Sequence, residues 1–368
     1  MLQEQVSVGV FEGPEEYMFG RVGAIAVTPS GELLVLDRQV PAIRKYSADG
    51  TYVSDIGREG GGPGEFRQPE AMNVLPDGRI LVRDPGNGRI TVFNPDGSWS
   101  ADWRLPSGGT WSTSEKLYVD TAGNAYTYIL LDIQADITDW RYGLARYTPE
   151  GVLVDTIAYP TWDYEEHTVV ARREGSSSSR RVPFTPEVVV AFSPLGYMVG
   201  GVSDDYRIAL LRRVVPRLRI ERAYTPVPVS DEEADERVRH VTRNLQRNYP
   251  GWRWDGPAIP EHKPAFRDIL VADDGRLWVH VPQPGEPFRS EAAAAEEEER
   301  TGRPQLRYRE PAAFDVFEPD GRYLGRVEAP TGFRTGPEPV IRGDTVWAIV
   351  FDELDVATVV RFGIARGR

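Results

Sequence analysis

The chain has 368 residues, of which 40 % are hydrophobic, with a formal net charge of −13 and no cysteine. The acidic balance argues against a nucleic-acid surface, which needs a concentrated basic face, and the lack of cysteine excludes disulfides and thiolate metal sites. No apolar run is long enough to predict a transmembrane helix.

The opening residues MLQEQVSVGV lack a basic segment followed by an apolar run, so this sequence as it stands predicts no signal peptide. A repeat then organises the first hundred residues. Three pairs of identical residues stand at one constant spacing: Ala24 and Ala71, Gly31 and Gly78, and Asp37 and Asp84. Self-similarity at a fixed period indicates an array of like units.

Each unit starts with a strand that reverses at a short glycine-containing hairpin, and strand-forming segments follow it. These hairpins lie at residues 29–31, 76–78, 121–123, 194–196, 273–275 and 342–344. A second hairpin of the same kind completes several units, so the unit is a four-stranded antiparallel meander. Six such units predict an all-β fold, a six-bladed β-propeller.

We expect a single domain whose blades span residues 20–57, 69–104, 115–159, 187–224, 265–329 and 337–368. The last blade ends after its third strand. Residues 4–11, with alternating valines, are expected to supply the fourth strand, because closure by the two termini removes the exposed edges of an open array. Insertions are expected at residues 160–186, 225–264 and 282–309.

One stretch resembles a known repeat. Residues 84–90, DPGNGRI, with the hydrophobic pair at 92–93 and Asp96-Gly97, resemble the NHL repeat, and residues 57–71, GREGGGPGEFRQPEA, resemble the loop that joins NHL blades. The chain is therefore similar to bacterial six-bladed propellers of the NHL-repeat superfamily, many of which are exported. This resemblance implies a fold rather than an activity.

All three insertions fall on one face, because the second and fourth connections of a meander leave from the same side. We call it the long-loop face. Residues 230–249 predict a helix that begins with a capping box of Ser230 and Glu233. Its apolar stripe either docks on the propeller or binds a partner. Residues 291–300 predict a second, solvated helix, and residues 172–181 predict a mobile loop tip whose arginines could clamp an anion.

Aromatic residues gather in or beside the long-loop face. They are Trp111, Trp140, Trp162, Tyr249, Trp252 and Trp254. They could line a concave mouth for a protein or an apolar small molecule. Packing of the loops over the blades is the equally weighted alternative.

Four glutamates precede inner strands at the mouth of the expected axial channel: Glu70, Glu115, Glu187 and Glu338. Converging carboxylates suit Ca²⁺ or Mg²⁺, and the pattern resembles propeller lactonases of the gluconolactonase and paraoxonase kind, which hold a metal there. Those enzymes also use Asn and Asp ligands, for which only Asn73 and Asp204 or Asp205 are available. We expect no cofactor, with an axial Ca²⁺ or Mg²⁺ as the alternative.

His280 is the candidate catalytic residue, because it follows a strand near the channel mouth and streptogramin-type lyases on similar propellers use histidine with magnesium. The other histidines lie in insertions without the spacing of a zinc pair. Asp37 and Asp84 are instead expected to secure the following turn and a neighbouring arginine such as Arg89.

These observations support two hypotheses. The first is a non-enzymatic propeller that binds a protein partner through its long-loop face, or serves as an accessory subunit of an extracytoplasmic assembly that could be membrane-attached. The second is a metal-dependent hydrolase or lyase. We expect a periplasmic or extracellular location, with the cytoplasm as the alternative, and no nucleic-acid partner.

Overall fold

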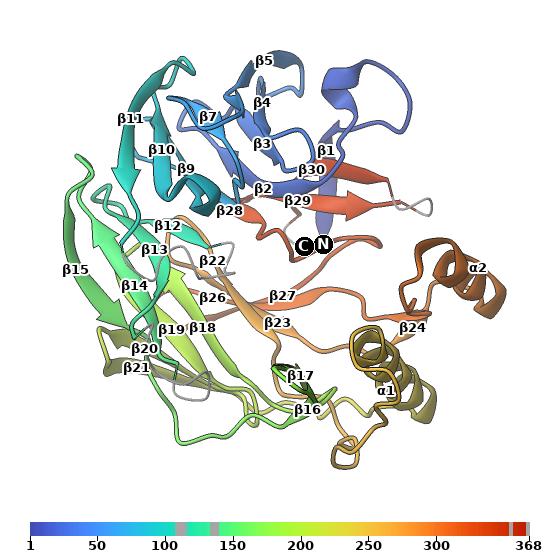
Figure 1. The fold of residues 1–368 in the computed structure, drawn as a ribbon. Coiled ribbons are helices and arrows are strands. Elements are labelled where there is room, and N and C mark those ends of the chain that lie inside the picture. The colour runs from blue at the N-terminus through green and yellow to red at the C-terminus, as the bar shows by residue number, and fades with distance from the viewer. Residues whose placement is uncertain (107–115, 133–139, 353–355, 366–368) are drawn as a thin grey trace.

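The computed structural model describes residues 1–106, 116–132, 140–352 and 356–365. Six antiparallel sheets of four strands follow one another around a ring (Figure 1), which confirms the six-bladed propeller expected from the sequence. Inner strands of neighbouring blades contact one another around the axis.

The first three blades contain the strands of the clearest repeats. Blade one is β2 (Val22–Val27), β3 (Leu33–Asp37), β4 (Ala42–Tyr46) and β5 (Tyr52–Ile56). Blade two is β8 (Ala71–Val74), β9 (Ile80–Asp84), β10 (Arg89–Phe93) and β11 (Trp99–Arg104). Blade three is β12 (Leu117–Val119), β13 (Ala125–Leu130), β14 (Tyr142–Tyr147) and β15 (Leu153–Ala158).

The remaining blades complete the ring. Blade four is β18 (Val188–Ser193), β19 (Tyr197–Val202), β20 (Arg207–Arg212) and β21 (Val215–Glu221). Blade five is β22 (Asp268–Val271), β23 (Leu277–Val281), β26 (Ala313–Phe317) and β27 (Tyr323–Glu328). Blade six is β28 (Val340–Arg342), β29 (Thr345–Phe351), β30 (Ala357–Ile364) and the N-terminal strand β1 (Leu2–Val8).

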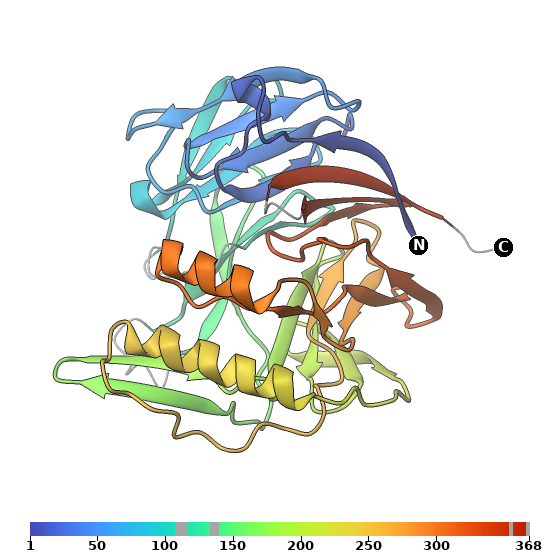
Figure 2. The same cartoon turned by 90° about the vertical axis from the view of Figure 1, so that its right-hand side faces the viewer.

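The expected closure is confirmed, since β1 pairs antiparallel with β30 and places Leu2 opposite Ile364 and Val8 opposite Val359. Leu2 and Val8 are buried, while most residues between them are exposed. The strand therefore covers the core with Leu2 and Val8, and its register shifts between Glu4 and Val6. The two ends of the chain consequently lie close together (Figures 1 and 2).

Elements outside the blades belong mainly to the long-loop face. They are the short pairs β6 (Arg58–Glu59) with β7 (Glu65–Phe66) and β24 (Glu286–Pro287) with β25 (Tyr308–Arg309), the hairpin β16 (Thr168–Arg173) with β17 (Ser176–Arg181), and the helices α1 (Asp231–Gln246) and α2 (Glu291–Thr301). Short 3₁₀ turns occur at η1 (Glu15–Tyr17) and η2 (Pro85–Asn87). Both predicted helices are confirmed, and Ser230 and Glu233 form the complete capping box.

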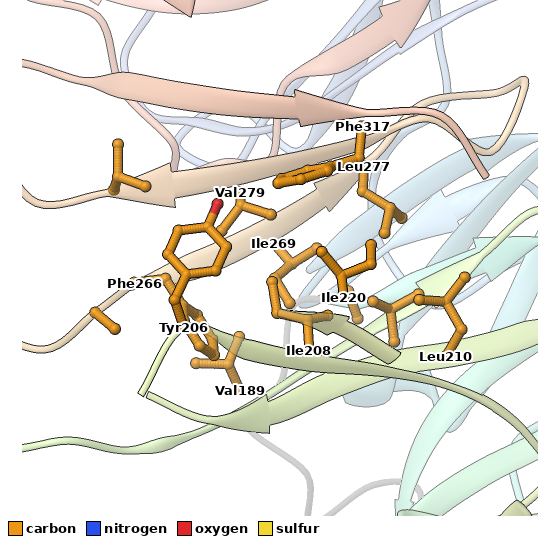
Figure 3. Close-up of a cluster of buried hydrophobic side chains, with 14 of the residues drawn as sticks. Val189, Tyr206, Ile208, Leu210, Ile220, Phe266, Ile269, Leu277, Val279 and Phe317 are labelled. Carbon is orange, nitrogen blue, oxygen red and sulfur yellow. The ribbon is translucent and has the colours of Figure 1, made fainter. Parts of the chain in front are cut away.

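The core consists of apolar layers between neighbouring blades. Between blades four and five, Ile208 and Val189 meet Ile269 and Leu277 (Figure 3). Tyr206 lies in the same layer, and its hydroxyl donates a hydrogen bond of 3.2 Å to the buried Asp315 carboxylate. Because both faces of each blade are covered, the inner strands position side chains at the axis with little freedom.

The short hairpins on the opposite face follow the predicted turn chemistry. Gly31 and Gly78 both have a φ of +89°, a conformation that residues with a side chain rarely adopt. Among the described residues, no helix is long and apolar enough to cross a membrane.

Candidate functional site

The insertions are joined into one platform over the long-loop face. Helix α1 lies next to α2 (Figure 2), and Arg243 of α1 forms a 2.6 Å ion pair with Glu298 of α2. The platform therefore couples the insertion after blade four to the insertion inside blade five.

Two buried carboxylates of α1 hold it in place. Glu233 lies 2.6 Å from the Lys263 ammonium, which also donates to the Gln283 carbonyl oxygen and lies 3.1 Å from Glu310. Glu236 accepts hydrogen bonds from the Arg307 and Tyr308 backbone amides at 3.0 and 3.1 Å. The predicted apolar stripe is thus only part of the docking face, because charged partners bury the first two turns.

Residues 172–181 are not the mobile loop tip that we expected. Most of them belong to the hairpin β16–β17, in which Ala171 pairs with Ser178 and Arg173 with Ser176. Val169 and Ala171 are buried against Leu245 of α1. A serine-rich segment is a weak strand former by itself, so this tertiary contact stabilises the hairpin that the sequence did not predict.

The predicted aromatic residues divide into separate groups. Tyr249, Trp252 and Trp254 belong to the apolar cluster between α1 and the β16–β17 hairpin, where the two indoles meet edge to face. Trp162 lies against Gly200 of β19, where a Cβ atom at residue 200 would lie 3.1 Å from the indole and would collide with the Val189 carbonyl oxygen. Trp140 is half-buried, and Trp111 lies outside the described residues. Tyr249, Trp252 and Trp254 therefore pack the insertions together, as the alternative to a binding mouth predicted.

The predicted metal ligands do not converge. Glu70 is buried in an ion pair with Arg83, whose Nε also donates to the Thr127 hydroxyl. Glu187 pairs with Arg181 of the hairpin, and Glu115 lies outside the described residues. Within the described part of the chain, no group of three or more His, Asp and Glu residues could hold a metal ion. The described members of the predicted set are therefore not brought together as ligands of one ion.

The fourth glutamate, Glu338, faces an axial cavity of about 600 Å³ together with Lys116 and Asp268. Burial alone would lower the pKa of Lys116, but the charges of Glu338 and Asp268 raise it. Burial raises the pKa of both carboxyl groups, and Lys116 opposes this effect. Glu338 is exposed on the wall of this cavity. The charges are therefore placed where a small polar ligand could meet them.

Sequence reasoning missed Lys116 and Asp268. Both begin or directly precede inner strands, as the predicted glutamates do. The available signal was the rarity of lysine, which occurs at only three positions in this arginine-rich chain: Lys45, Lys116 and Lys263.

His280 lies on β23 opposite Asp268 and contacts the Phe314 ring at a centroid distance of 5.2 Å. Burial lowers its pKa to about 4, helped by the Arg267 guanidinium and opposed by Glu310. The imidazole is therefore neutral near pH 7. It faces a second cavity, of about 490 Å³, away from Lys116 and Glu338.

We call this second cavity the basic pocket. It is lined by Arg237, His240, Arg267, His280, Phe288, Arg289, Pro304, Gln305, Leu306, Tyr308, Arg309, Glu310 and Arg334. Sequence reasoning did not find it, because its arginines come from α1, the start of blade five, the blade-five insertion and the segment before β28.

The repeat aspartates have the structural role that was expected, with one correction. Each secures the turn that follows it, since Asp37 accepts from the Gln39 backbone amide at 2.9 Å and Asp84 accepts from the Asn87 side-chain amide at 2.8 Å. Each also accepts from two backbone amides of the connector that precedes its blade. Arg89 instead donates to the Gly62 and Glu65 carbonyl oxygens and pairs with Asp102.

Comparisons with known proteins agree with the propeller fold. A family model described as a 6-bladed beta-propeller matches residues 4–142. A DUF4221 family member from Bacteroides vulgatus is 10 % identical, with a TM-score of 0.58 over 100 % of this chain and 99 % of its own. A Bacteroides fragilis protein described as exported is 13 % identical, with a TM-score of 0.51 over 100 % of this chain and 95 % of its own.

A gluconolactonase from Xanthomonas campestris is 13 % identical, with a TM-score of 0.45 over 98 % of each chain. No curated protein matches this chain. At these identities the two Bacteroides structures support the fold alone. The NHL likeness of residues 57–97 stays a prediction.

Proposed function

We propose that this chain is a non-enzymatic binding propeller that works outside the cytoplasm and holds a protein partner on its long-loop face. It acts there by itself or as an accessory subunit of a larger assembly, which could be membrane-attached. The description of the similar Bacteroides fragilis protein as exported motivates the location.

The observation that carries this proposal is an exposed apolar patch on the long-loop face beside blade one. Phe11 is 67 % exposed and Val40 is 50 % exposed, and Val10 and Met18 are exposed as well. These four side chains, which we call the apolar patch, belong to two loops that are tied together, because the Gly20 backbone amide donates to the Asp37 carboxylate at 2.8 Å. Exposed apolar side chains on loops that are held together favour a protein contact.

The contacts of two predicted metal ligands and the position of His280, the candidate catalytic residue, support the same conclusion. Glu70 and Glu187 are occupied by arginines, and His280 lies on a different cavity from the axial charges. A general acid or base must reach the proton that it moves. Neither the paired glutamates nor the histidine is placed beside the Lys116 ammonium.

Crosslinking in the native host tests the proposal. The double variant F11S/V40S removes two apolar side chains of the patch, and L153S/V154S is the matched control, since those residues are 46 % and 51 % exposed on the outer strand β15. We expect a crosslinked partner with the wild type and the control, and at least tenfold less with F11S/V40S. Equal recovery with both variants would contradict the proposal, as would recovery of no partner.

A metal-dependent hydrolase or lyase stays the alternative prediction. A cation that binds only the folded chain raises its melting temperature. Titration with Ca²⁺ and Mg²⁺ up to millimolar concentration, followed by thermal melting, separates the two functions. A rise that the Glu338→Gln variant abolishes would favour the enzyme, and no rise is expected for the binding propeller.

A further inference from the structure

The basic pocket carries a concentration of positive charge that contrasts with the rest of the molecule. Its lining includes five arginines and a single carboxylate, Glu310, in a chain whose formal net charge is −13. Glu310 is already paired with Arg267 and with the buried Lys263. Among the lining residues, arginines therefore outnumber carboxylates, and a lining of this composition attracts an anion.

Arg237 is the clearest sign of a missing ligand. It projects from α1 into the pocket and is half-buried, yet no hydrogen bond or ion pair joins its guanidinium to another described residue. Burial lowers its pKa, and the nearby Arg267 lowers it further, while carboxylates of α1 and Glu310 oppose the shift. A half-buried cation beside another cation is costly unless something compensates it.

The walls of the pocket indicate the shape of the anion. Arg309 lies 4.0 Å over the Phe288 ring, and Arg289 donates to the Gln305 side chain at 2.9 Å, so both guanidinium groups are held in defined positions. Planar guanidinium groups recognise phosphate and sulfate oxygens through pairs of hydrogen bonds. Phe288 and Tyr308 give the same pocket an aromatic wall.

We propose that the basic pocket binds the phosphate or sulfate group of a small organic ligand, with Arg237 and Arg309 as binding residues and the aromatic wall against the organic part. The site goes beyond the proposed protein contact. It lies on blade five and the insertions, whereas the apolar patch lies beside blade one, so either proposal can fail while the other stands.

Calorimetric titration near pH 7 tests the site with phenyl phosphate, phenyl sulfate and phenol as probes. We expect at least one of the two esters to bind with a Kd of about 1 mM or less and phenol not to bind. Arg237→Gln and Arg309→Gln should each weaken ester binding about tenfold or more. Arg239→Gln is the matched control, because Arg239 lies on the same helix but is exposed and outside the pocket.

Several results would overturn the site. One is that phenol binds as tightly as the esters. Another is that neither ester binds at about 10 mM, ten times the expected Kd. The third is that Arg237→Gln and Arg239→Gln bind the esters with equal affinity. A peptide that contains phosphoserine decides the source of the group. If it binds more than tenfold tighter than phenyl phosphate, and Arg237 is required, the phosphate belongs to a protein rather than to a small ligand.

Thermal stability separates binding from a structural role. Without ligand, Arg237→Gln removes a half-buried cation that faces Arg267, so its melting temperature should rise by about 2 °C. Phenyl phosphate at saturation should raise the melting temperature of the wild type and not that of the variant. If Arg237→Gln instead lowers the melting temperature, and Arg309→Gln keeps full affinity, Arg237 is structural and the site is overturned.

Discussion

Burial changes the charge and the pKa of the His280 side chain. Its imidazole lies on β23 among Phe314, Arg267 and Glu310, and its pKa falls to about 4. At pH 7 it can donate and accept hydrogen bonds as a neutral ring, and it carries no charge. The candidate catalytic residue of the sequence analysis therefore lines the basic pocket as a neutral side chain.

This burial predicts a specific loss of stability in acid. Below pH 6.5 the unfolded chain protonates His280, while the folded chain does so only near pH 4, so protons favour the unfolded state in that window. Relative to His280→Gln, the wild type should lose about 2–3 kcal/mol of unfolding free energy between pH 7.5 and 4.5. Urea denaturation of both proteins at both pH values measures the difference.

His262 supplies the control for this measurement, because its side chain is exposed. His262→Gln should follow the wild type at both pH values. Parallel loss in the wild type and His280→Gln would show that the imidazole is not buried as a neutral group.

At the scale of elements, the platform behaves as one unit because buried ion pairs connect its parts. Lys263 is 3 % exposed and lies between Glu233 of α1 and Glu310 beside β25. Removing one partner of a buried pair leaves an uncompensated charge, which costs several kcal/mol. Stability of the platform therefore depends on a residue that belongs to no helix or strand.

Lys263→Met should destabilise the platform by about 3–5 kcal/mol and leave the other blades largely unaffected. Hydrogen exchange should then lose protection in α1 and in residues 282–310 together. Lys45→Met is the control, since Lys45 pairs with Glu32 at 2.9 Å in blade one. Loss of protection in α1 alone, with residues 282–310 unchanged, would contradict a single coupled platform.

The whole molecule is closed by one strand from each end of the chain. Val8 is 1 % exposed and packs with Ile25 and Val35 of blade one, so β1 joins the first and last blades. While β1 is in place, the edge of β30 is paired and blade six has its fourth strand. Closure therefore couples residues from both ends of the sequence.

Deletion of residues 1–12 should lower the melting temperature by more than 10 °C and expose the β30 edge, which favours association between chains. Val8→Ala tests the same contact without deletion and should cost about 2 kcal/mol. Gln3→Ala, at an exposed position of β1, should be neutral. Differential scanning calorimetry and light scattering follow both effects, and an unchanged melt after deletion would rule out this closure.

Local signals in the sequence account for the predictions that held. Hairpin glycines such as Gly78, the alternation of β1 and the capping box of Ser230 and Glu233 depend on residues close together in the chain. Backbone conformation and strand pattern are set over a few residues, so they can be read from the sequence. The propeller, its closure and both helices follow from such signals.

Tertiary structure alone decided which polar groups meet. The Arg83 side chain removes Glu70 from any metal site, α1 supplies the apolar contact that makes a hairpin of the serine-rich segment, and four separate segments bring arginines into the basic pocket. Residue spacing carries no information about such contacts, because they form only when distant strands and insertions pack. The sequence by itself therefore determined the blades and their closure, and the packing of the insertions over them determined where a ligand can bind.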